Sequence, residues 1–280
     1  MVVLRRNDSA TSLLLFLYNN YLSEFNKDTL KLSSLLDIMR VFGKSESATR
    51  MSLSRTVKAG ILINQTIGNE VNYSLSPDGK NAIKVFNEEI IAFWKRYTLR
   101  NKPWDNKWHL LNLEFTEENK EAKDPVQEKL RQLSFGTLAA NTWISPHYQP
   151  EEIQQVLNEF SLGKYSLQMH GEITDQREYL IEKVFQLNKL VKPYQDFLTM
   201  FRAKFEETKE VAKRDSFAPE GQALPLMREL GWEFFFIAAE DPALPKTLQP
   251  FWVGDEAAQL MMEYRGMLLD ATKKYLGKFE

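Results

Sequence analysis

Apolar residues recur at helical spacing along the first sixty positions. Two predicted helices carry them on one face each: Leu13, Leu14, Leu17 and Tyr18 in the first, and Leu32, Leu35, Leu36 and Met39 in the second. Gly43 follows the second helix, at a place that favours a residue tolerant of positive φ. Ser45 is the predicted N-cap of a third helix over residues 46–59, which Gly60 closes. Two helices joined by a short glycine-containing turn are typical of a helix-turn-helix unit.

A hairpin and a long helix come next. Residues 61–67 and 70–75 are strand-like and flank Gly68-Asn69, a pair that suits a two-residue turn. Pro77 favours the first turn of a further helix. The apolar seam of that helix consists of Ile83, Phe86, Ile90, Phe93 and Tyr97. The seam is longer than a small domain needs, so it would pack either on a second copy of the chain or on helices of the C-terminal part, and we favour the latter because those helices offer matching apolar faces. The pattern over residues 1–100 predicts a winged helix-turn-helix domain.

After a linker at Asn101-Lys102-Pro103, strands and helices alternate. Strands are expected at 107–115, around 143–144 and at 165–173, with helices at 125–133 and 150–160. This order fits a ferredoxin-like domain over residues 101–174 in which one strand is poorly marked. Residues 175–280 are expected to be helical, with helices at 179–190, 193–213, 226–239 and 256–276 and a break at 219–221. The predicted fold class is therefore α+β and multidomain: a winged helix-turn-helix, a central ferredoxin-like domain and a helical C-terminal domain.

Charge is unevenly divided along the chain. The net charge of −2 combines a balance of +5 in residues 1–100 with −7 in residues 101–280. A basic N-terminal third favours polyanion binding at that end. The absence of cysteine excludes disulfides, thiolate metal sites and a cysteine nucleophile. Apolar runs such as 13–18 and 234–239 are far shorter than a membrane helix needs, so we expect a cytoplasmic protein without a membrane segment.

The third helix carries the strongest functional signal. Ser47, Arg50, Ser54 and Lys58 share one stripe at i, i+3, i+7 and i+11, and Leu53 lies off it, where it can face the core. Such a stripe suits a major groove, where arginine reads guanine edges and hydroxyls reach bases or phosphates. The alternative is a solvated helix face, but the preceding turn and the following hairpin favour DNA binding. The candidate DNA-binding residues are Ser45, Ser47, Arg50, Ser54, Arg55, Lys58 and Asn69.

Signals of an enzyme are weak. The sequence contains no Walker loop, GxGxxG, GxSxG or HExxH, so we predict no catalytic residue, no metal and no cofactor. The histidines are His109, His147 and His170, of which the first and third would approach each other on neighbouring strands. Two alternatives stay open. One is a metal-dependent nuclease or hydrolase in the central domain that uses His109, Glu114 or His170, and the other is a winged helix that binds protein.

The C-terminal part contains a longer signature. Its residues are Asp241, Pro242, Ala243, Leu244 and Pro245, followed by Leu248, Pro250, Trp252, Gly254 and Ala257. This DP-x-LP…L-x-P-x-W-x-G…A pattern resembles that of the PaaX family of transcriptional repressors, which control phenylacetic acid degradation and related pathways. Segments 47–60 and 103–108 are similar to the family's recognition helix and to the entry to its central domain. The resemblance thus covers essentially the whole chain.

The resemblance implies a winged helix, a central domain similar in fold to Cas2 and a helical effector or dimerisation domain, acting as a homodimer. It implies a repressor that binds an inverted-repeat operator in double-stranded DNA and that an acyl-CoA effector, such as phenylacetyl-CoA, releases. One departure concerns the helix before the signature, where the family usually carries an arginine beside its aromatic residues. Here Glu233 follows Trp232, which leaves the acyl group of the effector open.

A pocket for a CoA thioester needs cations near aromatic walls, because the ligand joins an anionic nucleotide to an apolar acyl group. Arg228 lies one helical turn before Trp232, and Trp252 follows the DP-x-LP turn. These three residues are the candidate effector-binding residues. The alternative is that both tryptophans belong to the core and that Arg228 pairs with a surface carboxylate.

Overall fold

The computed structural model describes residues 10–213 and 221–279. The chain forms two compact units. The first comprises Met1–Asn87, Thr199–Phe234 and Ala258–Glu280, and the second comprises Glu88–Leu198 and Phe235–Ala257. The long helices α4 (Pro77–Arg100), α8 (Asn188–Lys213), α9 (Ala223–Ala238) and α10 (Val253–Leu276) each contribute residues to both units.

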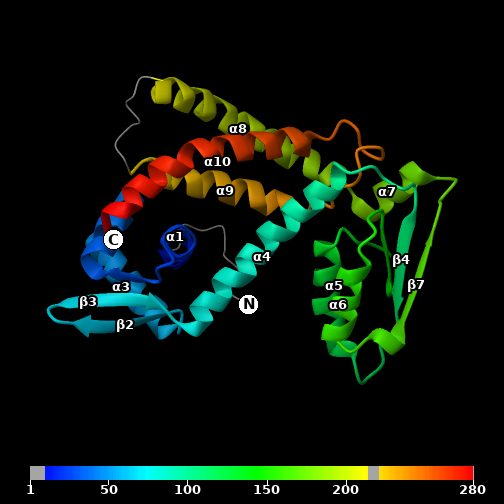
Figure 1. The fold of residues 1–280 in the computed structure, drawn as a ribbon, viewed down its shortest axis with the longest axis horizontal. Coiled ribbons are helices and arrows are strands. Elements are labelled where there is room, and N and C mark those ends of the chain that lie inside the picture. The colour runs from blue at the N-terminus through cyan, green and yellow to red at the C-terminus, as the bar shows by residue number, and fades with distance from the viewer. Residues whose placement is uncertain (1–9, 214–220, 280) are drawn as a thin grey trace. The chain divides into compact units, whose positions relative to one another are not determined.

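The first unit contains the winged helix-turn-helix. Its elements before α4 are α1 (Ala10–Phe25), β1 (Thr29–Lys31), α2 (Leu32–Val41), α3 (Glu46–Lys58), β2 (Leu62–Ile67) and β3 (Glu70–Leu75) (Figure 1). The strands form an antiparallel sheet in the order β1-β3-β2. Ile67 pairs with Glu70 across the Gly68-Asn69 turn, and Gly68 has a φ of +61°, which confirms the predicted hairpin. Strand β1 was not expected, because three residues are too short to show a period of two.

The core of the first unit joins α1, α2 and α3 to the C-terminal helices. Leu17 and Leu53 are fully buried in it, together with Leu224 of α9 and Leu276 of α10. The Tyr21 hydroxyl donates a hydrogen bond to the Leu276 carbonyl oxygen at 2.6 Å. The N-terminal fold and the end of the chain therefore share one apolar core.

The second unit contains the central domain. Its elements between α4 and α8 are β4 (Trp108–Leu113), α5 (Lys123–Gln132), β5 (Gly136–Ala139), β6 (Thr142–Ser145), α6 (Pro150–Glu159), β7 (Ser166–Gly171) and α7 (Arg177–Phe185). Short 3-10 helices lie at Lys120–Ala122 and Gly163–Tyr165 here, and at Gly277–Phe279 in the first unit. The four strands form an antiparallel sheet in the order β5-β6-β4-β7, the arrangement of a ferredoxin-like fold. Strand β5 is the strand of the expected ferredoxin-like domain whose sequence pattern is weak.

Helices α5 and α6 bury one face of this sheet. Leu111 and Trp143 pack there with Leu130 and Leu157. On α4, the ring of Phe93 meets Phe235 of α9 edge-on at 6.3 Å between centroids. The C-terminal half of the seam thus contacts a C-terminal helix, as expected, whereas Ile83 lies in the core of the first unit.

The first two C-terminal helices differ most from the expected bounds, while α9 and α10 each begin three residues earlier than expected. The helix expected at 179–190 ends at Phe185, because Gln186 takes a left-handed conformation with a φ of +47°. Helix α8 then begins at Asn188, so Pro193 lies inside it instead of starting it. Of the expected break at 219–221, Pro219 and Glu220 lie outside the described residues. None of the helices at 10–213 and 221–279 has the length and apolar character needed to cross a membrane.

Candidate nucleic-acid interface

The chain fixes α3 at both ends. The Ser45 hydroxyl accepts a hydrogen bond from the Ala48 backbone N–H at 3.2 Å, which confirms the predicted N-cap. After the helix, Gly60 takes a φ of +74°, a conformation that glycine adopts without steric cost. The start and the end of the helix are therefore set by the local sequence.

One face of α3 is buried and the other is exposed. Leu53 is fully buried, as predicted. Thr49 and Thr56 are buried beside it, with hydroxyls that donate to the carbonyl oxygens of Ser45 and Ser52 one turn earlier. The opposite face presents the predicted residues, all of them exposed: Ser47, Arg50, Ser54, Arg55 and Lys58. The structure thus brings the stripe together on one accessible surface.

The wing presents polar side chains that carry no positive charge. Asn69 lies exposed at the tip, and residues 64–66 of β2 are exposed along its length. Ile63 and Ile67 are also more than half exposed on this strand. An ion pair at 2.9 Å joins Lys31, the last residue of β1, to Glu70, the first residue of β3 after the turn. The amide and hydroxyl groups of the wing can donate or accept hydrogen bonds, and the cations lie on α3.

The three candidate effector residues fall into different units. In the first unit, Arg228 donates a hydrogen bond to the Ser12 hydroxyl at 3.0 Å and lies 5.6 Å above the ring of Trp232. Trp252 belongs to the second unit, where it is 6% exposed. Its indole N–H donates to a carboxylate oxygen of Asp241 at 2.8 Å. Arg228 and Trp232 therefore form a pair, and Trp252 is already held in a buried network.

Two of the histidines meet as the sequence suggested. His109 pairs with His170 in the β4–β7 register, with 6.1 Å between ring centroids. Burial lowers the pKa of His109. Glu114 lies exposed just beyond the end of β4. Among the residues that the structure describes, no group of three histidine, aspartate or glutamate side chains is placed to hold a metal ion.

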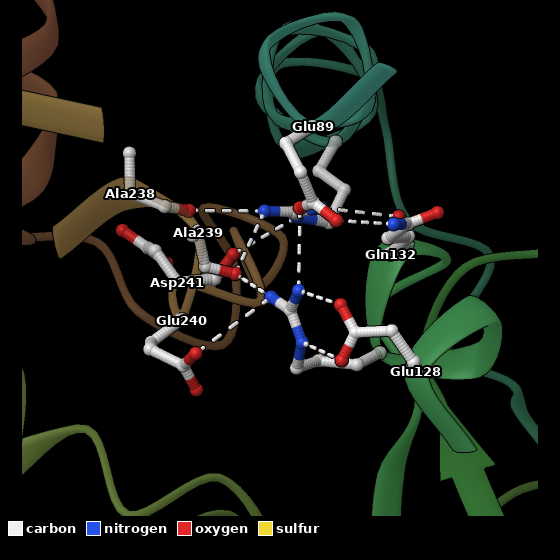
Figure 2. A network of polar contacts seen from close by, with 9 residues as sticks. Glu89, Glu128, Gln132, Ala238, Ala239, Glu240 and Asp241 are labelled. Carbon is white, nitrogen blue, oxygen red and sulfur yellow. Dashed lines mark hydrogen bonds and ion pairs between the residues drawn. The ribbon is translucent and has the colours of Figure 1, made fainter. Parts of the chain in front are cut away.

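A buried polar network in the second unit was not foreseen. Arg96 of α4 is only 1% exposed and donates to the carbonyl oxygens of Gln132, Ala238 and Asp241 at 2.9–3.1 Å. Figure 2 shows Gln132 and Glu128 on one side of this network and the turn from Ala238 to Asp241 on the other. Burial lowers the pKa of the Arg96 guanidinium to about 10, so the group stays charged at neutral pH. Arg96 thus holds the turn from Ala238 to Asp241 in place through hydrogen bonds to the backbone carbonyl oxygens of that turn.

The carboxylate of Asp241 explains several residues of the signature. It accepts hydrogen bonds from the Tyr194 hydroxyl, the Trp252 indole and the Ala243 backbone N–H, each at 2.8 Å. A Cβ at Gly254 would lie 2.3 Å from the Trp252 indole nitrogen, so only glycine fits there. The DP-x-LP and W-x-G residues are therefore parts of one packed structure.

Arg100 completes this structure. Its guanidinium binds both carboxylate oxygens of Asp255, at 2.6 and 2.7 Å, and donates to the carbonyl oxygens of Leu244 and Gln249. Arg96 and Arg100 stand three and seven residues after Phe93, so helical spacing placed them on a buried face. Arginine is seldom fully buried without a partner, and the partners lie about 140 residues away in sequence, so no local pattern could reveal them.

Comparisons with known proteins agree with this architecture. Three family models match: "PaaX-like protein" over residues 9–79, "PaaX protein central Cas2-like domain" over 101–180 and "PaaX-like protein C-terminal domain" over 185–278. No curated protein matches the chain. Among solved structures, the uncharacterized protein Rv0674 from Mycobacterium tuberculosis aligns with a TM-score of 0.60 at 16% identity, over 96% of this chain and 99% of that one. That likeness shows the fold alone. Since the family models match most of the sequence, the chain belongs to the PaaX family, a family of transcriptional repressors in phenylacetic acid catabolism.

Proposed function

We propose that the chain is a homodimeric repressor that acts in the cytoplasm and binds an inverted-repeat operator of catabolic, phenylacetate-type genes through α3. One observation carries the proposal: the stripe of Ser47, Arg50, Ser54 and Lys58 is exposed on a helix whose other face lies in the core of a winged helix-turn-helix. Membership of the PaaX family supports it. A two-fold dimer presents two such helices to two half-sites, which is why we expect an inverted repeat.

The stripe combines the two kinds of contact that operator recognition needs. The Arg50 guanidinium offers a rigid fork of donors that matches the O6 and N7 acceptors of guanine. Ser47 and Ser54 lie on either side of it with short hydroxyls. Lys58, one turn further along, offers an ammonium that suits a phosphate. Base contacts give sequence preference, and phosphate contacts fix the position of the helix on the duplex.

The test is binding to duplexes from the gene's own promoter region, followed by fluorescence anisotropy. We expect Arg50→Ala to lose about 1–3 kcal/mol of discrimination at one base position in each half-site, and little at the others. Arg265→Ala is the matched control, because it removes the same charge from an exposed position on α10, outside the winged helix. It should bind as the wild type does.

Two outcomes would contradict the proposal. If no promoter duplex bound even at low salt, the winged helix would be better explained as a protein-binding module. If Arg50→Ala and Arg265→Ala weakened all duplexes equally, the attraction would be general and α3 would not read bases.

Release by an acyl-CoA is the second part of the proposal. Arg228 and Trp232 support it, because they place a cation over an aromatic ring within the first unit, the combination that an anionic nucleotide with an apolar acyl chain requires. A ligand weakens operator binding only if it prefers the conformation that does not fit DNA. A contribution from Trp252 stays a prediction.

Tryptophan fluorescence, titrated with CoA, acetyl-CoA and phenylacetyl-CoA with and without operator, tests this part. We expect one thioester to bind and to lower operator affinity, and Arg228→Gln to weaken that thioester without changing DNA binding in its absence. A wild-type protein that responds to none of the thioesters would exclude this effector class and leave the DNA-binding proposal intact.

A further inference from the structure

Met51 is an apolar side chain on the exposed face of α3, where its neighbours are polar. It is 50% exposed and directly follows Arg50 in the sequence. The larger apolar residues elsewhere on the helix behave differently: Leu53 is fully buried, and Val57 packs partly buried against the core. At 3.6 residues per turn, Met51 lies only about 40° around the helix from Ser47. Met51 therefore belongs to the exposed stripe.

The surroundings of Met51 distinguish it from other exposed apolar residues, which are common on soluble proteins. Seen along the helix axis, Arg50 lies about 60° to one side of Ser47, and Met51 lies about 40° to the other. Two long side chains thus flank the row formed by Ser47 and Ser54, and all four residues are exposed. The short serines allow the helix to come close to the floor of a major groove. The long side chains on both sides of the row can then reach base edges.

The place of Met51 along the helix also favours bases over phosphates. It lies in the second turn of α3, which begins at Glu46. In helix-turn-helix proteins the N-terminal residues of the recognition helix are those that contact base edges. A methionine on a helix also points back toward the helix N-terminus. In the proposed complex, the Met51 side chain is therefore directed at the bases.

The chemistry of the major groove limits what an apolar side chain can meet there. Packing Met51 against the ring nitrogen, carbonyl or amino groups of a base would cover polar atoms without replacing their hydrogen bonds to water, which is unfavourable. The C5 methyl group of thymine is the apolar group that the major groove presents. A methionine side chain is unbranched and flexible, so it can adapt its shape to such a methyl group.

We propose that Met51 contacts the C5 methyl group of one thymine in each half-site of the operator and thereby adds a preference for that base. This inference rests on the proposed DNA-binding function and extends it by one residue and one base. A helix with its side chains is about 10–12 Å wide, and successive bases of one strand are about 3.4 Å apart. The thymine should therefore lie within about three base pairs of the guanine that Arg50 contacts.

Replacing thymine with uracil tests this contact, because uracil lacks only the methyl group and keeps every hydrogen-bonding group of the base. The starting point is a promoter duplex that the full-length wild-type protein binds. Each thymine is replaced in turn with deoxyuridine, together with its counterpart in the other half-site, and binding is followed by fluorescence anisotropy. We expect one such replacement to weaken wild-type binding roughly tenfold, because each half-site loses one methyl contact. The thymines outside the reach of Met51 should tolerate the replacement.

Met51→Ala identifies the protein side of the contact. Alanine is a strong helix former and the position is exposed, so the variant should unfold like the wild type in thermal denaturation. We expect it to bind the thymine duplex roughly tenfold more weakly than the wild type does, and to lose nothing further when uracil replaces the contacted thymine. Met262→Ala is the matched control, because it truncates a methionine that is 46% exposed on α10, outside the winged helix. It should distinguish thymine from uracil as the wild type does.

The outcomes separate this inference from the proposed function. If Arg50→Ala loses base discrimination but Met51→Ala still distinguishes thymine from uracil as the wild type does, the repressor would stand and the Met51 contact would be excluded. Wild-type binding that no uracil replacement weakens would exclude the contact in the same way. A wild-type protein that binds no promoter duplex would contradict both the proposed function and this inference.

Discussion

At the scale of single residues, Arg100 shows how far apart in sequence the partners of one side chain can be. Its guanidinium is 1% exposed and binds Asp255 as well as two backbone carbonyl oxygens. Replacing it with methionine removes the donors to two carbonyl oxygens and to the carboxylate of Asp255, which is 25% exposed. We expect Arg100→Met to lower the free energy of unfolding by roughly 3–5 kcal/mol, measured by urea denaturation followed by circular dichroism.

Arg100→Lys is the informative companion variant. It keeps the charge but cannot form the two-pronged contact with Asp255, so it should fall between the wild type and Arg100→Met. If Arg100→Met unfolded at the same urea concentration as the wild type, the hydrogen bonds of the buried Arg100 guanidinium would contribute nothing to stability.

His147 gives the molecule a pH dependence. It is buried and donates from Nε2 to the Ala243 carbonyl oxygen at 3.0 Å. Burial lowers the pKa of His147 to about 4, below the value of about 6.5 in an unfolded chain. Protonation therefore favours the unfolded state. Stability from this group is complete above pH 6.5 and is lost as the pH falls toward 4. We expect a loss of about 2 kcal/mol between pH 7 and pH 5.

His147→Gln is the control for that prediction. Its amide can still donate to the Ala243 carbonyl oxygen but does not titrate. The variant should lose less stability than the wild type over the same pH range in urea denaturation. Parallel pH profiles of the two proteins would show that His147 is not the group responsible.

At the scale of secondary structure, the N-cap of α3 links folding to the proposed function. Ser45→Ala removes the acceptor for the Ala48 N–H and should cost about 1 kcal/mol of stability. Ser45→Asp keeps a good cap and adds a negative charge at the helix N-terminus, which the helix dipole favours. We expect Ser45→Asp to unfold like the wild type in thermal denaturation and yet to bind operator more weakly, because the new carboxylate repels phosphate. Operator binding that is unchanged in Ser45→Asp would place the start of α3 away from DNA.

At the scale of the whole molecule, the uneven charge distribution has to be corrected for burial. Two of the cations in the basic N-terminal third, Arg96 and Arg100, are buried in the second unit and are bound there. The cations available to a polyanion are therefore mainly those of the winged helix, including Lys58. We expect operator affinity to fall linearly with salt on logarithmic axes. Lys58→Ala should weaken all duplexes alike and reduce the slope by about one per half-site. An unchanged slope would remove Lys58 from the phosphate contacts.

The sequence by itself determined the elements whose signals are local. Helical spacing, the Ser45 cap and the Gly68-Asn69 turn depend on neighbours within a few residues, so the winged helix and the exposed stripe of α3 could be predicted from them. The ferredoxin-like order was also readable, because alternating strands and helices leave few arrangements. Weakly marked segments such as β1 and β5 were missed, since three or four residues show too little of a period.

Only the tertiary structure decided the fate of residues whose partners are distant. Arg96 and Arg100 share the helix face of Phe93, but only the folded chain places the carbonyls near Asp241 and the carboxylate of Asp255 around their guanidinium groups. The indole N–H of Trp252, a candidate effector residue, donates to Asp241. The physical reason is that burying a charge or an indole N–H is favourable only where a hydrogen-bonding partner is supplied, and that partner comes from elsewhere in the fold.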